Sequence, residues 1–453
     1  MQNNPERWYI RLTRNIRQKL RWFAPGLGVK RWLTLILVGT TLIGVGIAML
    51  FLDIYRTAPD TWWLPSLSIA ALRFLDRPLR VIIFGGIGVG AVLWGIYGLN
   101  RSLMRPFMRP GQAMVDTVTA YRRRERGPRV VVIGGGTGLS SLLRGLKAYT
   151  NNLTAIVTVA DDGGSSGELR RSVGILPPGD IRNCLIALSN DEALLAQIFQ
   201  YRFSSGAGLN GHSLGNLFIT AMADITGSFE DAVSEAGRVL AVEGRVLPAT
   251  LHDVRLVASI HKADLGKDIQ VVGESEIPRH GGTIRRVWLE PNNPHAFPPT
   301  LQAILSADLI VIGPGSLYTS LLPNLLVPDL ADAVRASRAL KFFVCNVATQ
   351  SGETDGYNCG DHVTAVEKHL GGPIFDLIIV NNNTNPVLPD SIQWVCPETD
   401  LDQRYAVYQA NLVDSENPWR HDSMKLGKAI VDLYNERTGP LITREEGIAP
   451  IKL

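Results

Sequence analysis

The chain is poor in cysteine. Its 453 residues include only four, and no two of them form a CxxC pair. Structural zinc sites and disulfide frameworks need closely spaced or numerous cysteines, so the sequence excludes both. A reducing compartment fits this composition. The four residues are Cys184, Cys345, Cys359 and Cys396.

Positive charge is scarce in the larger part of the chain. Residues 1–31 hold eight Lys and Arg against one Glu, and residues 101–129 hold eight Arg against two acids, yet the whole chain has a net charge of only +3. Residues 130–453 are therefore acidic on balance, which is not typical of a nucleic-acid-binding domain. Nucleic acid is not an expected partner.

Charge is also absent from two long segments. Residues 32–52 and 81–100 contain 21 and 20 uncharged positions, enough for a helix to cross a hydrocarbon core of about 30 Å. We therefore expect two transmembrane helices, and the basic flanks place both termini and the main domain in the cytoplasm, at the inner membrane. A buried core helix or an uncleaved signal segment is the alternative interpretation of either segment.

The most informative stretch that is present runs from Arg129 to Asp162. A β-branched strand at 130–133 leads into a glycine turn, an amphipathic helix and a second strand at 154–160. Glycines let a phosphate approach backbone N–H groups, and the helix N-terminus stabilises an anion. Dinucleotide-binding folds place an acid after the second strand, against ribose hydroxyls. The predicted ligand-binding residues are Gly134, Gly135, Gly136, Thr137, Gly138, Asp161 and Asp162.

Neither standard phosphate-binding motif is complete in this stretch. Counting from Gly134, the sixth position holds Leu139 where the dinucleotide fingerprint has glycine, and no Walker lysine-serine pair follows. A glycine turn without a ligand, with Asp161 and Asp162 capping the next turn, is the alternative interpretation.

Two polar loops follow. DDGGSSGELRRSVGILPPGDIRN supplies hydroxyl and guanidinium donors for phosphate oxygens and a predicted N-cap, Asp180, for a helix reaching Leu188. LNGHSLGN places polar side chains before another helix, where they either bind a sugar or base or hold the turn together. The candidate residues are Ser165, Ser166, Arg170, Asp180, Asn183, His212, Ser213 and Asn216.

A second glycine turn follows a buried strand at 309–312. Parallel strands end at one sheet edge, where ligands bind, so both glycine turns are expected to face one ligand. Polar residues also follow predicted strands at 341–346 and 376–381, although Asn381 and its neighbours equally suit a simple turn. The candidates here are Gly313, Gly315, Ser316, Asn346 and Thr349.

These patterns predict an α/β fold with a Rossmann-like, mostly parallel sheet. Short apolar runs between 241 and 291 predict a β-rich insertion. The expected domains are an N-terminal membrane anchor with a basic linker over residues 1–128 and a cytoplasmic nucleotide-binding domain over residues 129–453.

The ordered motifs resemble one family over essentially all of 130–453. They are VVVIGGGTGLS, TVADDGGSSGELR, PPGDIRNCL, GHSLGN, IGPGSLYTS, CNVATQSGETDGY and DHV. In this order they resemble the YvcK family of gluconeogenesis factors, which is similar in turn to CofD, the 2-phospho-L-lactate transferase. The resemblance implies a Rossmann-like, CofD-like cytoplasmic protein that binds nucleotide sugars of the UDP-GlcNAc type.

The same resemblance implies a regulatory role in carbon metabolism, cell shape and cell-wall synthesis. Its expected partners are a nucleotide sugar, the membrane, a second copy of the chain and cell-wall synthesis proteins. CofD instead moves a phospholactyl group from a nucleotide diphosphate to a deazaflavin with magnesium, and Asp161 with Asp162 could hold that ion. A regulator is the preferred interpretation, with no catalytic base identified. A transferase and a membrane scaffold that needs no nucleotide are the alternatives.

Overall fold

A computed structural model describes residues 76–104 and 122–439, except 191, 207 and 399, together with eight positions between 37 and 48. The chain divides into two compact units, Met1–Arg122 and Arg123–Leu453.

The main described element of the first unit is α4 (Arg77–Met104), a helix of 28 residues. Within the described ranges, no helix is both long enough and apolar enough to cross a membrane. The predicted span over 81–100 coincides with α4 and is not supported. The predicted span over 32–52 lies mostly outside the described residues.

The second unit is built on a seven-stranded sheet in the order β10-β9-β8-β7-β1-β2-β3. All of its strand pairs are parallel, so the predicted parallel α/β sheet is confirmed. The strands are β1 (Val130–Gly134), β2 (Leu153–Val157), β3 (Arg245–Pro248), β7 (Leu309–Ile312), β8 (Leu340–Val344), β9 (Leu377–Asn381) and β10 (Ala406–Ala410).

Helices cover both faces of this sheet, because successive strand side chains point to opposite faces. Val130 and Val132 join one core cluster, and Val131 and Ile133 join the other. The first face is covered by α6 (Gly136–Leu146), α8 (Gly179–Leu188) and α18 (Ser423–Thr438). The second is covered by α13 (Pro298–Leu305), η3 (Leu317–Leu321), α14 (Leu322–Leu325), α15 (Pro328–Ala336) and α16 (Cys359–Leu370).

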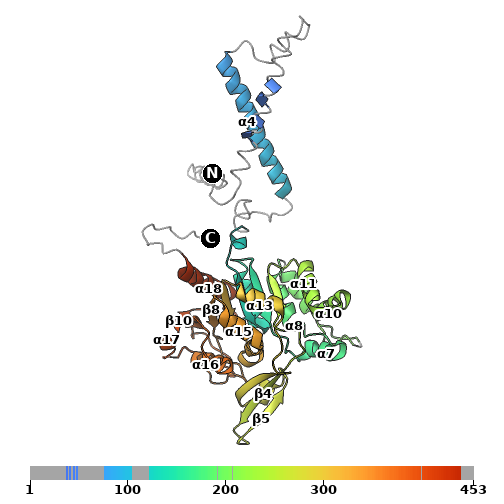
Figure 1. Cartoon of the computed structure of the whole chain (residues 1–453), viewed down its shortest axis with the longest axis vertical. Coiled ribbons are helices and arrows are strands. Elements are labelled where there is room, and N and C mark those ends of the chain that lie inside the picture. Colours follow the sequence, from blue (N-terminus) through green and yellow to red (C-terminus); the bar gives the residue numbers. More distant parts are fainter. Residues whose placement is uncertain are drawn as a thin grey trace, which may run out of the picture. The chain divides into compact units, whose positions relative to one another are not determined.

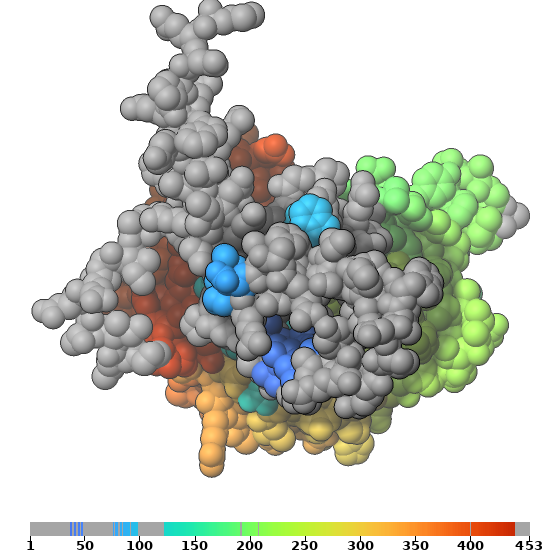
Figure 2. Space-filling view, turned by 90° about the horizontal axis from the view of Figure 1, so that it is seen from above, coloured from blue at the N-terminus to red at the C-terminus, as the bar shows by residue number. Residues whose placement is uncertain are grey.

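The remaining elements extend the two ends of the sheet. The two sheet edges are well separated: residues near 200–240 (green) and residues near 400–439 (red) lie on opposite sides in Figure 2. Near the β3 edge, α11 (Phe229–Val239) packs beside β3, and α10 (Leu214–Thr226) packs on α11. Two further helices, α7 (Gly164–Val173) and α9 (Glu192–Gln200), pack on α10. At the other edge, α17 (Leu401–Arg404) precedes β10.

The predicted insertion is a separate three-stranded antiparallel sheet in the order β5-β4-β6. Its elements are β4 (Arg255–Lys262), β5 (Lys267–Val272), α12 (Ile277–His280) and β6 (Thr283–Glu290). Figure 1 shows β4 and β5 projecting beyond the main sheet. The first strand of the segment, β3, instead belongs to the main sheet.

Strand order reverses at β1. The chain runs from β1 to β2 and β3 on one side, and then returns to place β7 and β8 on the other. In open parallel sheets, ligands bind beyond the carboxyl ends of the strands at such a reversal. The fold therefore directs attention to the loops that follow β1 and β7.

Candidate functional site

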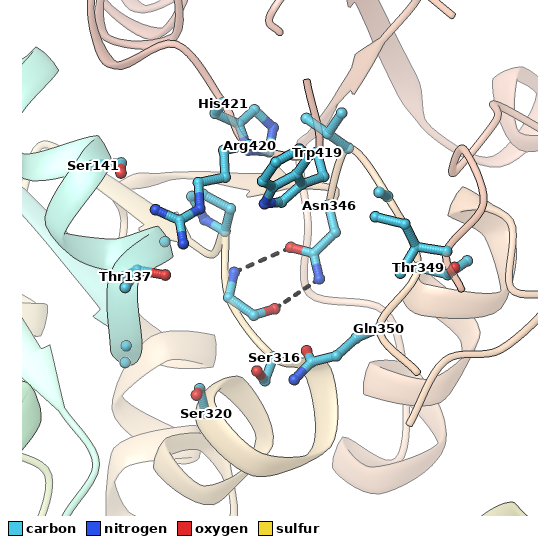
Figure 3. Close-up of a pocket in the computed structure, with 18 of the residues that line it drawn as sticks. Thr137, Ser141, Ser316, Ser320, Asn346, Thr349, Gln350, Trp419, Arg420 and His421 are labelled. Carbon is cyan, nitrogen blue, oxygen red and sulfur yellow. Dashed lines mark hydrogen bonds between the residues drawn. The ribbon is translucent and has the colours of Figure 1, made fainter. Parts of the chain in front are cut away.

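A cavity of about 350 Å³ lies beyond the carboxyl ends of β1, β7 and β8. Its size is within the usual range for small-molecule sites. Its lining comes from five stretches of chain that are far apart in sequence, and Figure 3 shows the polar side chains among them. The lining residues are Gly135 to Gly138, Ser141, Pro314 to Ser316, Ser320, Asn346 to Ser351, Ile392 and Trp419 to His421.

The first glycine turn forms the start of α6 at this cavity. Gly135 is the N-cap and has no side chain that could cap the helix, but the Asp180 carboxylate accepts a hydrogen bond from the Gly136 N–H. The next residue, Gly136, has φ of +63°, which favours glycine. The start of the helix brings its positive dipole end and the remaining N–H groups of its first turn to the cavity, where they would stabilise an anion.

The two glycine turns touch each other. A Cβ atom on Gly138 would lie 2.5 Å from the carbonyl oxygen of Pro314, so only glycine fits at this contact. Gly315 in turn approaches the carbonyl oxygen of Gly135. Both turns therefore line one cavity, as the strand pattern predicted.

An asparagine in the loop after β8 holds the second glycine turn in place. Asn346 accepts a hydrogen bond from the Gly315 N–H at 3.1 Å and donates one to the Gly315 carbonyl at 2.9 Å. Behind the turn, the buried carboxylate of Glu353 accepts a hydrogen bond from the Thr319 hydroxyl at 2.8 Å. The Ser316 and Ser320 hydroxyls therefore stand on a rigid support beside the cavity (Figure 3).

The segment before α18 forms the opposite wall. Trp419 keeps 40% of its surface exposed, and Arg420 is exposed beside it. Arg420 is the one lining residue with a formal charge, and it forms no ion pair within the described part of the chain. His421 is buried, and desolvation lowers its pKa to about 4, so the ring is neutral.

A group of acids lies behind the two glycine turns rather than in the cavity lining. Burial, together with the negative charge of neighbouring Asp161, raises the pKa of Asp180 to about 6 and that of Glu274 to about 8. Burial alone raises the pKa of Glu353 to about 7 against its hydrogen bonds. These carboxyls therefore exchange protons near neutral pH.

The paired acids after β2 make contacts within the protein. Asp161 accepts a hydrogen bond from the Gly163 N–H at 2.9 Å, and Asp162 accepts one from the Ser275 N–H at 3.0 Å. Asp162 thereby ties the insertion to the main domain. Across the described residues, no three acidic, histidine or cysteine side chains are placed to hold a metal ion. The magnesium prediction on these two residues remains untested.

The candidates of the two polar loops form a buried hydrogen-bond network. Ser165 Oγ lies 2.9 Å from His212 Nδ1, and the Asn216 amide donates to Ser165 Oγ at 3.1 Å. Arg182, which the sequence analysis did not single out, donates to Asn216 Oδ1 at 2.8 Å and also contacts Ser213. None of these side chains lines the cavity; the network joins the starts of α7, α8 and α10.

The other candidates occupy supporting positions. Arg170 donates to the Val254 carbonyl at 2.6 Å and pairs with Asp253, and Asn183 accepts from Arg182. Ser166 lies against Asp161 beside Gly179. Asp180 is inside α8 rather than its N-cap, which is Pro178, and its carboxylate accepts from the Gly136 N–H. Gly134 and Gly313 precede the turns without lining the cavity.

Trp419, Arg420 and His421 are the main lining residues that the sequence analysis missed. They lie between β10 and α18 in a segment without strand or helix periodicity. The sequence offered one indication of a binding role for them, namely that an aromatic, a cationic and an imidazole side chain are consecutive. Thr349, predicted to line the site, does so, whereas Asn381 is buried and donates to the Asn383 carbonyl as a turn residue.

Comparison with known proteins gives a consistent result. The family model described as 2-phospho-L-lactate transferase CofD matches residues 130–430. A gluconeogenesis factor from Bacillus subtilis is 47% identical over 321 residues, covering 68% of this chain and 99% of the relative. A relative from Nostoc that bears the same name is 46% identical over 441 residues, covering 94% of both chains, so its likeness extends into the N-terminal unit.

A solved structure agrees with the sequence comparisons. The crystal structure of a UPF0052 family protein from Bacillus halodurans is 46% identical, with a TM-score of 0.63. It covers 68% of this chain and 99% of its own. That share corresponds in length to the second unit, which contains the cavity.

Proposed function

We propose, given that the chain belongs to the gluconeogenesis factor family and carries a CofD family domain, that its cavity binds a nucleotide sugar of the UDP-GlcNAc type. Ligand occupancy would then regulate carbon metabolism, cell shape and cell-wall synthesis through partner proteins. The observation that supports this most is the convergence on one cavity of a helix N-terminus, two glycine turns and an arginine that forms no ion pair among the described residues.

The anionic part of such a ligand would meet these groups. A diphosphate needs several N–H donors and a positive charge, and backbone amides at a helix start supply the donors. Arg420 supplies charge and a planar set of donors on the facing wall. Figure 3 shows its guanidinium extended toward Thr137 and Ser141.

The uncharged part would meet the remaining wall. Trp419 offers a flat aromatic face for a base or sugar ring, and Gln350 and Thr349 offer side-chain hydrogen-bonding groups. No carboxylate lines the cavity in the described part of the chain, so an anionic ligand would meet no direct repulsion there.

A CofD-like transferase is the second candidate function. The acids behind the two turns favour it, because pKa values of about 6 for Asp180 and about 7 for Glu353 suit proton transfer near neutral pH. A regulator is preferred because these carboxyls do not line the cavity. The inner-membrane location and assembly with a second copy remain predictions.

A titration with product analysis distinguishes the two functions. UDP-GlcNAc should raise the melting temperature of the full chain and remain chemically intact. Arg420→Ala should weaken binding at least tenfold, while Arg437→Ala, an equal loss of charge on the exposed end of α18, should leave it unchanged. Cleavage of the nucleotide would favour the transferase, and equal effects of both variants would remove Arg420 from the site.

A further inference from the structure

His421 is held firmly at the edge of the cavity. Its backbone pairs with Val413 in an isolated antiparallel bridge, and the next residue, Asp422, caps α18 by accepting from the Met424 and Lys425 N–H groups. The side chain is only 7% exposed. The ring position is therefore set before any ligand arrives.

The two ring nitrogens have different surroundings. One is hydrogen-bonded to the backbone of Cys345, at the end of β8. The other, Nε2, is buried but has no hydrogen-bond partner among the described residues. A buried polar atom without a partner loses its hydration and gains nothing in exchange, so such atoms point to a missing partner.

The chemistry of Nε2 follows from these surroundings. Because the ring is neutral and its other nitrogen donates to a backbone carbonyl, Nε2 carries a lone pair and can only accept. A lone pair repels phosphate oxygens, which are themselves acceptors. The partner that Nε2 can take is therefore an N–H or O–H donor and not a phosphate oxygen.

We propose that His421 is a specificity-determining residue that accepts, through Nε2, a hydrogen bond from an uncharged N–H or O–H donor of the bound nucleotide. This inference rests on the proposed function and divides one wall among three neighbours: Arg420 binds the diphosphate, Trp419 packs on a ring, and His421 recognises a donor group. Figure 3 shows the three side chains together on this wall.

The donor has two possible sources, a base N–H or a sugar hydroxyl. Calorimetric titration of the full-length wild-type chain with UDP-GlcNAc, its N3-methyluracil analogue, its 2′-deoxy analogue and UDP separates them. The ligand that lacks the recognised donor should bind roughly tenfold more weakly than UDP-GlcNAc. Equal affinity for all four ligands would overturn the inference. This test uses only the wild-type chain, so it does not depend on whether a variant folds.

Two variants test the residue itself. His421→Phe keeps a ring but no acceptor, and it should weaken UDP-GlcNAc binding about tenfold while leaving the affinity for the donor-deficient analogue unchanged. His421→Gln retains an acceptor and should recover part of the loss. An equal loss for every ligand would assign His421 a structural role only. If wild-type chain binds no nucleotide at all, the proposed function itself fails, an outcome distinct from uniform affinity.

Discussion

The side-chain amide of Asn346 holds both backbone hydrogen-bonding groups of Gly315, accepting at 3.1 Å and donating at 2.9 Å. This reciprocal pair connects the loop after β8 to the turn after β7. It fixes the second glycine turn in the conformation that lines the cavity. The turn can therefore keep this conformation without a bound ligand.

Asn346→Ala should therefore impair binding and modestly destabilise the fold. Losing two hydrogen bonds of about 1 kcal/mol each should lower the melting temperature by roughly 4–8 °C, and ligand affinity should fall about tenfold. Thermal denaturation with and without UDP-GlcNAc measures both effects. Asn382→Ala, at an exposed position whose backbone alone is hydrogen-bonded, is the matched control and should change neither. Unchanged affinity in Asn346→Ala would show that the turn needs no such support.

Gly138→Ala should separate the two glycine turns. The added Cβ would lie 2.5 Å from the Pro314 carbonyl oxygen, so one turn must move, at a cost of about 1–3 kcal/mol. Gly138→Ala should abolish ligand binding, whereas the protein should lose only this part of its free energy of unfolding. The control is Gly237→Ala in α11, where the new methyl group meets only ordinary contacts at 3.7 Å and 3.9 Å and helix propensity improves. Full binding by the Gly138 variant would contradict the contact between the turns.

Stability should fall as pH rises through the neutral range. The unfolded carboxyls ionise near pH 4, but in the fold the pKa values reach about 6 for Asp180 and about 8 for Glu274. The folded state thus binds more protons between these limits. The resulting stabilisation is fully present below pH 4 and is lost as the pH rises through about 6 for Asp180 and about 8 for Glu274.

Melting temperatures measured from pH 5 to pH 8 test this sign. Glu274→Gln should flatten the decline and raise the melting temperature at pH 8, because a neutral amide replaces a carboxyl that resists ionisation. Glu416→Gln, at an exposed site, should leave the profile as it is. A wild-type profile that rises toward pH 8 would show that these acids are ionised and well solvated.

The parts of the site that follow regular elements were predictable from sequence. Gly135 to Gly138 and Gly315 to Ser316 come directly after buried β-branched strands, and the shared edge of a parallel sheet brings them together. Asn346 was predicted by the same rule, since it follows β8.

Residues placed by irregular chain were not predictable in this way. Trp419 to His421 reach the cavity through the path between β10 and α18, which no periodicity describes. Ser165, His212 and Asn216 were predicted as ligand-binding candidates from their polarity, and in the fold they hydrogen-bond to one another inside the protein.

Calorimetric titration of UDP-GlcNAc into the full chain, followed by mass analysis of the recovered ligand, tests the central claim most directly. We expect saturable binding of one ligand per chain, lost in Arg420→Ala, with the nucleotide sugar recovered intact. Absence of heat and of thermal stabilisation at millimolar ligand, or binding that Arg420→Ala leaves unchanged, would contradict the assignment of this cavity as a nucleotide-sugar site.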